Sequence, residues 1–387
     1  MDKPIRVLHV IGIMNRGGAE TMIMNLYRNI DRSKVQFDFV ENTSQSAVFD
    51  EEIQLLGGRI YRCPHYNGKN HIAYCKWWNH FFDTHKNEYA IVHGHLGSTA
   101  AIYLSIAKKH GVYGIAHSHN TNLMKSPDDI IYALFAFPTR FIADHFFACS
   151  REAGVSRYGK KVGNDENRCT ILANAIDISK FIFNESIRQR MRDSLGITEN
   201  QLVIGNISRF AEQKNHLFLI DIFEKIREKS PDAVLLLVGD GERRPQIEAH
   251  ILEKNLSSNT ILTGIQSNTW DFYQAMDVFL MPSLYEGLPV SMVEAQTSGL
   301  PCCVSTSVPR EAAITDLVQF HSLSDSAEKW CGWVLGCTNR PRRNMKAEIQ
   351  KAGYDISVTS KWLENFYMNV VTSRGKQNQI NGVYPGV

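Results

Sequence analysis

Leu202-Val203-Ile204-Gly205-Asn206-Ile207 is a short apolar run in the middle of a chain of 387 residues. It repeats the pattern that opens the chain, where Ile5-Arg6-Val7-Leu8-His9-Val10-Ile11 is a similar strand-like run. After each run, short apolar segments alternate with longer amphipathic ones, as strands and crossover helices do in a mostly parallel sheet. The restart near residue 200 therefore predicts an α/β protein with two sheets.

The expected elements follow from this alternation. In the first half we expect strands at 5–11, 36–41, 59–62, 90–93, 113–117 and 145–149, and helices at 18–30, 47–56, 71–86, 98–109 and 128–142. In the second half we expect strands at 202–207, 233–238, 260–263, 277–281 and 301–304, and helices near 214–229, 243–255, 268–275, 289–298 and 325–337. The segment 169–177 is interpreted as the connection, because a strand-like piece there ends in turn-forming residues. A chain of 387 residues suits two domains of about 150 to 200 residues each, with a cleft between them.

The composition is that of a packed globular protein, with 43% hydrophobic, 21% charged and 10% aromatic residues. The formal net charge of +2 is too small to indicate nucleic-acid binding, which usually requires a concentrated basic face. Eight cysteines without a CxxC pair favour reduced thiols in a cytoplasmic protein. We therefore expect no nucleic acid among the partners and no disulfide framework.

No membrane span is expected. The first residues run directly into a strand-like segment that is too short and interrupted for a signal-peptide core. The longest nearly apolar stretch, 130–147, contains Pro138, Arg140 and Asp144. It therefore lacks the roughly 18 uninterrupted apolar residues that a membrane helix needs. Any membrane contact would be peripheral.

A glycine loop, Asn15-Arg16-Gly17-Gly18-Ala19-Glu20, follows the first strand and opens the first helix. Two glycines let the backbone approach a ligand closely, and a helix N-terminus offers unpaired N–H groups to an anion or a hydroxyl. The dinucleotide pattern GxGxxG is absent. The alternative interpretation is a plain tight turn.

Two His-x-His pairs, His93-Gly-His95 and His117-Ser-His119, lie at the ends of expected strands. Strand alternation places both histidines of a pair on one face, so a zinc site is geometrically conceivable. No carboxylate or cysteine accompanies them at ligand spacing. We therefore expect no metal site, and leave open substrate-contacting histidines and hydrogen-bonded core histidines.

The loop after the first strand of the second half carries two cations, Arg209 and Lys214, in Ser-Arg-Phe-Ala-Glu-Gln-Lys-Asn. Arg209 can donate two parallel hydrogen bonds to phosphate oxygens, and Lys214 adds a positive charge near a helix start. The alternative is a solvated loop. Further along, Gly239-Asp240-Gly241 at a strand end is a glycine turn that lets a base or ribose lie against backbone, and by itself it is a weak signal.

The most specific motif is Pro282-Ser-Leu-Tyr-Glu-Gly-Leu-Pro-Val-Ser-Met-Val-Glu-Ala295, which places Glu286 in a loop and Glu294 in the helix that follows. Glu294 is expected about two turns into that helix, on a face shared with the loop. Carboxylates there suit sugar or ribose hydroxyls, which need acceptors. The N–H groups of Leu288 and Val290 are expected to be free for phosphate, and Pro289 costs nothing in a first turn.

These motifs resemble those of the retaining glycosyltransferases of family 4, which have the two-domain GT-B architecture, and among them the bacterial exopolysaccharide or capsular polysaccharide enzymes. The resemblance covers nearly the whole chain. It rests on residues 17–20, His117-Ser-His-Asn120, Asn174-Ala-Ile-Asp177, Arg209 with Lys214, Gly239-Asp-Gly241, Thr263-Gly264 and the E-x7-E element of Glu286 and Glu294.

The resemblance implies a division of the chain. Residues 1–172 would form an acceptor-side Rossmann-like domain and residues 173–355 a domain that binds the nucleotide-sugar, with mostly parallel sheets facing across a cleft. Residues 356–375 have helical apolar spacing. In similar enzymes this helix packs back on the first domain. A helix that caps the second domain is the alternative that the sequence leaves open.

The resemblance also implies roles for individual residues. Gly17, Gly18 and Glu20 would lie on the acceptor side, and His119 would face the donor sugar. On the donor side, the resemblance assigns the diphosphate to Arg209 and Lys214, the sugar hydroxyls to Glu286, the ribose to Glu294, the base to Gly239, Gly241 and Gly264, and phosphate or sugar oxygens to the loop and helix start at Gly287, Leu288, Pro289 and Val290.

The implied function is transfer of a sugar from a nucleotide-sugar, with a UDP-sugar as first choice, to a glycan or lipid-linked saccharide in surface polysaccharide biosynthesis. No metal or other cofactor is expected, because the two cations and the helix N–H groups would stabilise the diphosphate. We expect a cytoplasmic enzyme. The inner face of the membrane is a candidate site of peripheral contact through a modest basic cluster, Arg151, Arg157, Lys160 and Lys161. The alternative is that these charges are ordinary solvated surface.

Two other kinds of protein fit the same sequence. One is a different GT-B enzyme, a nucleotide-sugar epimerase or a phosphorylase, which would turn over without an acceptor or with free phosphate. The other is a non-catalytic nucleotide-sugar-binding partner protein, which would bind the donor without transfer. The presence of both cations and both glutamates argues against the second.

Overall fold

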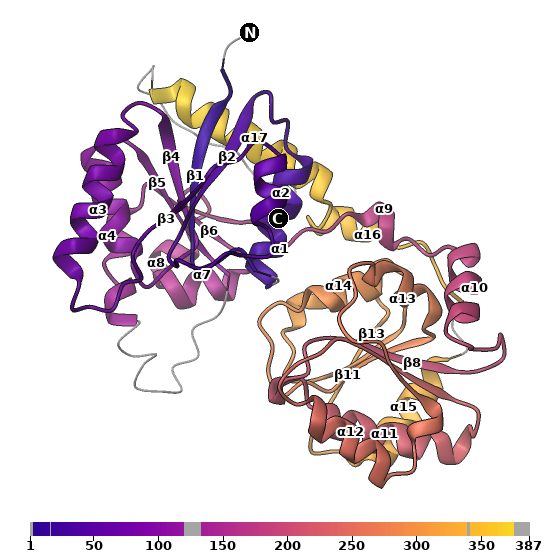
Figure 1. The fold of residues 1–387 in the computed structure, drawn as a ribbon. Helices are drawn as coiled ribbons and strands as arrows, with labels where there is room; N and C mark the ends of the chain where they lie inside the picture. Colours follow the sequence, from indigo (N-terminus) through magenta and orange to yellow (C-terminus); the bar gives the residue numbers. More distant parts are fainter. Residues whose placement is uncertain (1–2, 16, 120–132, 339–340, 375–387) are drawn as a thin grey trace. The chain divides into compact units, whose positions relative to one another are not determined.

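The structure of the protein is a computed structural model that describes residues 3–15, 17–119, 133–338 and 341–374. It divides into two compact units (Figure 1). Unit 1 comprises Met1–Ile176 together with Gly353–Val387, and unit 2 comprises Asp177–Ala352. Several residues of the sequence interpretation lie outside the described residues, namely Arg16 and Asn120 of the motifs, 128–132 of an expected helix and residue 375.

Unit 1 is built around a seven-stranded parallel sheet with the order β3-β2-β1-β4-β5-β6-β7. Its strands are β1 Ile5–Ile11, β2 Val35–Glu41, β3 Ile60–Arg62, β4 Tyr89–Gly94, β5 Tyr113–Ser118, β6 His145–Ala148 and β7 Cys169–Ile171. Its helices are α1 Gly18–Asn29, α2 Asp50–Leu55, α3 His71–Thr84, α4 Ala100–Lys109, α6 Thr139–Ile142, α7 Arg151–Tyr158, α8 Lys160–Gly163 and α17 Ile356–Arg374.

Unit 2 repeats the arrangement with a six-stranded parallel sheet, β10-β9-β8-β11-β12-β13. Its strands are β8 Val203–Ile207, β9 Val234–Val238, β10 Thr260–Leu262, β11 Val278–Met281, β12 Cys302–Ser305 and β13 Val318–His321. Its helices are α9 Ile178–Phe181, α10 Glu185–Ser194, η1 Glu212–Lys214, α11 His216–Lys229, α12 Arg244–Glu253, η2 Ser257–Asn259, α13 Thr269–Ala275, α14 Val290–Thr297, η3 Arg310–Ala312, α15 Ala327–Cys337 and α16 Lys346–Lys351.

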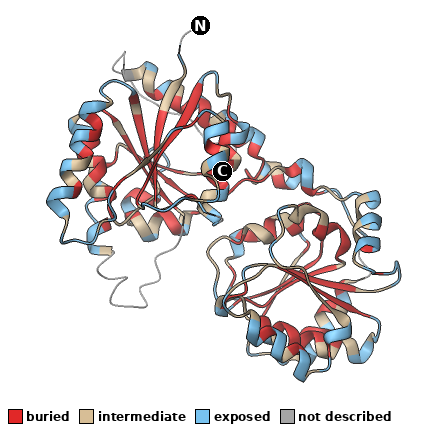
Figure 2. Cartoon of the chain, in the orientation of Figure 1, coloured by how far each residue is buried: buried red, intermediate tan, exposed pale blue. Residues whose placement is uncertain are grey.

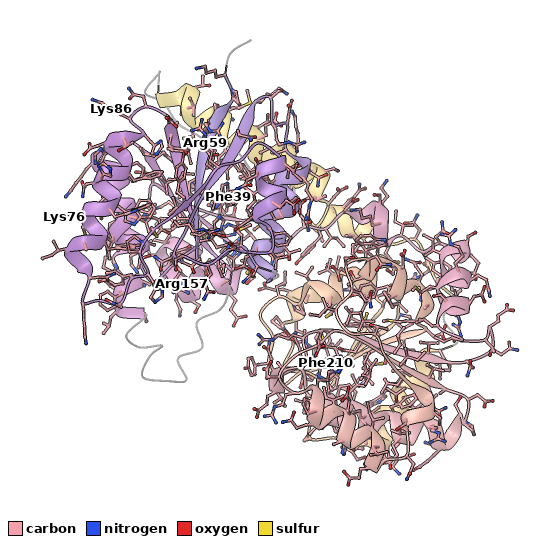
Figure 3. All side chains as sticks on the ribbon, viewed as in Figure 1. Phe39, Arg59, Lys76, Lys86, Arg157 and Phe210 are labelled. Atoms are coloured by element: carbon pink, nitrogen blue, oxygen red, sulfur yellow. The ribbon has the colours of Figure 1, made fainter. Side chains whose placement is uncertain are left out.

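The predicted α/β class with two parallel sheets is confirmed. Helices cover both faces of each sheet, so inner strands such as β2 and β9 are buried along their whole length (Figure 2). Phe39 and Phe210, labelled in Figure 3, are fully buried inside their units, whereas Lys76 and Lys86 lie exposed on the surface of unit 1.

The last helix belongs to the core of unit 1. Leu363, Phe366, Tyr367 and Val370 on α17 pack in the same apolar cluster as residues of α1 and β2. The chain therefore leaves unit 1 near Ile176 and returns to it at Gly353, so unit 1 is discontinuous in sequence. Of the two arrangements that the sequence left open for this helix, the structure shows packing on the first unit.

Two short segments differ from the sequence interpretation. Cys169–Ile171, expected as part of the connection, is the edge strand β7 and pairs in parallel with β6. Val318–His321, for which no strand was expected, is the edge strand β13 and pairs with β12. Both strands are only three or four residues long. They are too short for a recognisable period-2 pattern.

Candidate active site

In both sheets the strand order reverses beside the first strand, between β1 and β4 in unit 1 and between β8 and β11 in unit 2. Loops that leave the carboxyl ends of the two strands at such a switch point diverge to opposite faces and leave room for a ligand. In unit 2 these are the loop 208–215 after β8 and the loop 282–289 after β11. They are the two loops in which the sequence places the cations and the first glutamate.

The structure brings Lys214 and Glu286 together. The Lys214 ammonium donates to Oε1 of Glu286 at 2.7 Å, and the two side chains are only 16% and 5% exposed. Gln213 braces the pair, because its amide donates to Oε2 of Glu286 at 3.2 Å and to the carbonyl of Tyr285 at 2.9 Å. Because two donors hold the buried Glu286 carboxylate, its position is fixed before any ligand binds.

Arg209 lies in the same loop but is not part of this pair. Its side chain is exposed and makes no ion pair or hydrogen bond with the part of the chain that the structure describes. Its guanidinium therefore keeps its donors available for an anion, because no carboxylate of a described residue bonds to them.

Glu294 lies on α14, close to Tyr273 of α13. The Tyr273 hydroxyl donates to Oε2 of Glu294 at 2.8 Å and also lies 3.1 Å from the carbonyl oxygen of Ser291. Burial raises the pKa of Glu294 to about 7, although the Tyr273 hydrogen bond favours the charged form. The other carboxylate oxygen, Oε1, accepts no hydrogen bond from a described residue. Glu294 thus has one oxygen fixed and one free.

The loop before α14 ends in unpaired backbone donors. Within the described ranges, no acceptor lies in hydrogen-bonding position to the N–H groups of Gly287, Leu288 and Val290. The expected helix start is corrected here, because α14 begins at Val290 and Pro289 is its N-cap with extended backbone. Glu294 is consequently one turn into the helix, not two. The free N–H groups nevertheless form the positive end of a helix next to the Glu286 loop.

The glycines of the expected base site shape the neighbouring turns. A side chain at Gly239 would lie 2.0 Å from the carbonyl oxygen of Ser208, and one at Gly241 would lie 2.5 Å from that of Phe210. Gly239 also has a φ of 140° and pairs with Gly264, whose φ is 69°. Gly239 and Gly241 let the turn after β9 pack against the 208–210 segment, so they fix the position of the Arg209 loop.

A cavity of about 210 Å³ in unit 2 lies beside these loops and is lined by residues such as Ala211, Asn215, Arg243 and Leu284. None of the residues that the sequence assigned to the donor lines it. The predicted donor residues instead converge on the carboxyl edge of the sheet itself.

In unit 1 a cavity of about 260 Å³ lies at the carboxyl ends of β1, β4 and β5. Glu20 and His119, two of the predicted residues, both line it. Burial raises the pKa of Glu20 above that of an ordinary glutamate. Gly17 and Gly18 are exposed and are not among its lining residues. Gly17 is the N-cap of α1, where a side chain would meet the Glu20 carboxylate.

The histidine pairs form a larger network than the sequence indicated. His95 bridges His9 and His119, with ring-nitrogen distances of 2.9 and 2.8 Å. His93 bridges His117 and the Tyr367 hydroxyl of α17, at 3.1 and 2.6 Å. The predicted placement of each pair on one face is confirmed, because the rings stack with centroids 4.4 Å apart in one pair and 4.1 Å in the other.

The network is uncharged. Burial lowers the pKa of His9 to about 3 and that of His119 to about 4, and it also lowers the pKa values of His93, His95 and His117. Sequence reasoning missed His9, because it stands alone in β1 without a neighbouring histidine. Only the parallel register of β1 with β4, which places His9 opposite His93, could have indicated it.

Comparison with known proteins shows the family to which the chain belongs. A family model described as "Glycosyltransferase Family 4" matches residues 16–180, and one described as "Glycosyl transferases group 1" matches residues 187–329. A protein named as a glycosyltransferase, EpsF, in Bacillus subtilis is 35% identical over 95% of this chain and 97% of its own length. The capsular polysaccharide biosynthesis glycosyltransferase CapH of Staphylococcus aureus is 21% identical over 94% of this chain and 99% of its own length.

Solved structures share the fold. The UDP complex of Anabaena Alr3699/HepE has a TM-score of 0.71 at 16% identity, covering 96% of this chain and 98% of that one. WaaG, a glycosyltransferase involved in lipopolysaccharide biosynthesis, has a TM-score of 0.66 at 15% identity, covering 99% and 97%. The fold is thus the GT-B architecture. The chain belongs to glycosyltransferase family 4, and the predicted enzyme class is confirmed.

Proposed function

We propose that this glycosyltransferase transfers a sugar from a UDP-sugar to a hydroxyl of a glycan or lipid-linked saccharide, with retention at the anomeric carbon, in surface polysaccharide biosynthesis. The observation that carries the proposal is the polar edge of the unit 2 sheet. There the Lys214–Glu286 pair lies on the two loops that flank the switch point, together with Arg209 and the N–H groups before α14, which have no partner among the described residues.

These groups supply what a sugar diphosphate needs. Arg209 offers a forked donor, Lys214 a positive charge and the loop at 287–290 backbone N–H groups, so the diphosphate can be stabilised without a divalent metal. Glu286 presents acceptor oxygens to sugar hydroxyls. The free oxygen of Glu294 would accept from a ribose hydroxyl.

Front-face substitution is the chemistry that we assign to this site. The bond between the anomeric carbon and the leaving phosphate oxygen breaks, and its electron pair stays on the diphosphate. The acceptor oxygen bonds to the same face of the carbon, and its proton passes to the leaving phosphate oxygen. The negative charge that develops on the diphosphate is stabilised by Arg209 and Lys214. His119 would face the donor sugar.

Names of relatives support the choice of substrates. An Escherichia coli relative, 28% identical over 57% of this chain and 58% of its own length, is named UDP-Gal:alpha-D-GlcNAc-diphosphoundecaprenol alpha-1,3-galactosyltransferase. CapH is named for capsular polysaccharide biosynthesis. A UDP-linked donor and a lipid-linked or glycan acceptor are therefore the first substrates to test.

A lipid-linked acceptor would bring the enzyme to the cytoplasmic face of a membrane. No helix among the described residues is long and apolar enough to cross a bilayer. Peripheral contact is supported by large exposed apolar side chains on unit 1, such as Leu134 at 68% and Phe141 at 74% exposed. Lys160 and Lys161 are exposed as well. Flotation with anionic vesicles at low salt tests this contact, and absence of binding would exclude it.

Ligand-dependent thermal shift tests the donor assignment. UDP-, GDP- and dTDP-sugars are compared with and without EDTA, since a ligand that binds only the folded state raises apparent stability by mass action. We expect the largest shift with a UDP-sugar and no loss of it in EDTA. A shift that EDTA abolishes would refute metal-independent donor binding. The donor that gives the largest shift must also support sugar transfer to an acceptor in an activity assay.

A further inference from the structure

We propose that His95, His117 and His119 form a binding site in unit 1 for a borderline transition-metal ion such as Zn²⁺. The ion would have three imidazole ligands and one coordination position open to the cavity. This site lies in a different unit from the diphosphate-binding loops, and the proposal does not rest on the donor assignment.

The three rings already lie at ligand spacing. One ring nitrogen from each of His95, His117 and His119 lies within 4.8 Å of the others. They come from the carboxyl ends of β4 and β5, two neighbouring strands of a rigid sheet. Three imidazole ligands with water or a substrate in the fourth position are a known arrangement of zinc sites in proteins. All three histidines line the unit 1 cavity, so the fourth position has space in front of it.

The hydrogen bonds behind the cluster fit ligation. If Nδ1–H of His117 donates to His93, and Nδ1–H of His93 donates to the Tyr367 oxygen, the Nε2 of His117 is left as a bare lone pair. That nitrogen is buried and has no partner among the described residues. A metal-binding histidine characteristically donates its other N–H in this way, which orients the ring.

The same logic applies to His95. If its Nε2–H donates to Nδ1 of His9, its Nδ1 is a bare lone pair that faces Nε2 of His119 at 2.8 Å. A cation between these two nitrogens would take both lone pairs. The alternative is a pure hydrogen-bond chain in which Nε2–H of His119 donates to Nδ1 of His95. In both arrangements Nε2 of His9 and Nδ1 of His119 have no partner among the described residues, so the bare Nε2 of His117 is the atom that favours an ion.

Metal titration of the full-length protein tests the site directly. The protein is first stripped with a chelator and then titrated with Zn²⁺ by calorimetry and with Co²⁺ by visible absorption. We expect saturable binding of about one ion per chain, with the intense absorption of four- or five-coordinate cobalt. If the folded wild-type chain binds neither ion saturably, the proposal is wrong and the histidines form only a hydrogen-bonded core.

Variants locate the ion. His117→Ala and His119→Ala should each weaken Zn²⁺ binding by at least about tenfold. His250→Ala is the matched control, because this histidine lies on α12 in unit 2 and bonds to Asp221. Circular dichroism checks the fold, and His119, which is only partly buried at a strand end, serves if His117→Ala does not fold. Unchanged binding in a folded His119 variant would place the ion elsewhere and overturn the proposal.

Tyr367→Phe separates ligation from mere packing. Removing the hydroxyl takes away the acceptor for His93 but touches none of the three ligands. Loss of such an outer partner typically weakens metal binding by about 10- to 100-fold. We expect weaker Zn²⁺ affinity and a shifted Co²⁺ spectrum. An unaltered spectrum and affinity would contradict the proposed ligand orientation. The thermal shift with UDP alone should be the same with and without Zn²⁺, because UDP lacks the sugar that His119 would face and its expected partners lie in unit 2; the two proposals can therefore fail separately.

Discussion

Arg209 and Lys214 are expected to act alike on turnover but differently on stability. Replacing either by Ala should reduce kcat/KM by about 30-fold or more, because one preorganised donor to the leaving group contributes about 2 kcal/mol or more to the transition state. Arg209→Ala should leave the melting temperature unchanged, since its side chain is exposed and unpaired within the described chain. Steady-state kinetics with the preferred UDP-sugar measures the loss.

Lys214→Ala, by contrast, leaves the buried Glu286 carboxylate without its cation, so some loss of stability is expected as well. Lys229→Ala is the control, because this lysine pairs with Glu328 on the surface of unit 2, away from both loops. Full turnover in the Arg209 variant would show that the leaving-group assignment is wrong.

Glu294 should make stability depend on pH. Its folded pKa of about 7 lies above the ordinary glutamate value of 4.5, so the folded protein binds more protons than the unfolded chain between these two values. The free energy of unfolding from this group therefore falls as the pH rises from about 4.5 to 7. Glu294→Gln should flatten this slope, which melting curves from pH 5 to 7.5 would measure. An identical slope in the variant would show that Glu294 is not the titrating group.

At the scale of elements, the glycine turns position the cation loop. Gly239→Ala should lower stability by several kcal/mol or prevent the native turn, because its φ of 140° is unfavourable for alanine and the methyl group would overlap the Ser208 carbonyl. Gly336→Ala is the matched change, since nothing lies within 4 Å of its added methyl group and it sits inside α15. There the change should stabilise by up to about 1 kcal/mol. Urea denaturation compares the two, and equal effects would contradict the role of the turn.

The elements also show what the sequence could predict. Strands such as β1 and β8 were evident, because a parallel sheet covered on both faces requires continuous apolar runs. Helix α10 was missed for a physical reason. It is attached by arginines, with Arg188 bonding Asp277 at 2.6 Å and Arg192 buried against backbone carbonyls. Ile187 and Met191 are the two apolar residues of this ten-residue helix, too few for a sustained helical pattern.

The candidate site was predictable to a similar degree. The motif spacing placed Lys214 and Glu286 on two loops, but their 2.7 Å contact depends on β8 and β11 being neighbours although they are far apart in sequence. The raised pKa of Glu294 comes from its burial, and the Tyr273 hydroxyl that partly opposes this shift belongs to another helix. The contribution of His9 depends on the register of β1 with β4. Each missed feature is a contact between segments that only the sheet order brings together.

At the scale of the whole molecule, the two units have separate apolar cores, and each should respond to its own perturbation. Leu363→Ala on α17 empties part of the unit 1 core and should cost about 2 to 5 kcal/mol there. Val358→Ala on the same helix is the control, because Val358 is 40% exposed. A UDP-sugar, by contrast, should stabilise unit 2, where the predicted donor residues lie.

Calorimetry of the full-length protein distinguishes these effects. We expect Leu363→Ala to lower only the transition of unit 1 and the UDP-sugar to raise only that of unit 2, because the chain crosses between the units at Ile176–Asp177 and Ala352–Gly353 and their cores share no residue. If Leu363→Ala lowered both transitions equally, the units would fold as one cooperative body. If the UDP-sugar raised the unit 1 transition alone, the donor would bind to unit 1, and the assignment of Arg209, Lys214 and Glu286 to the donor would be wrong.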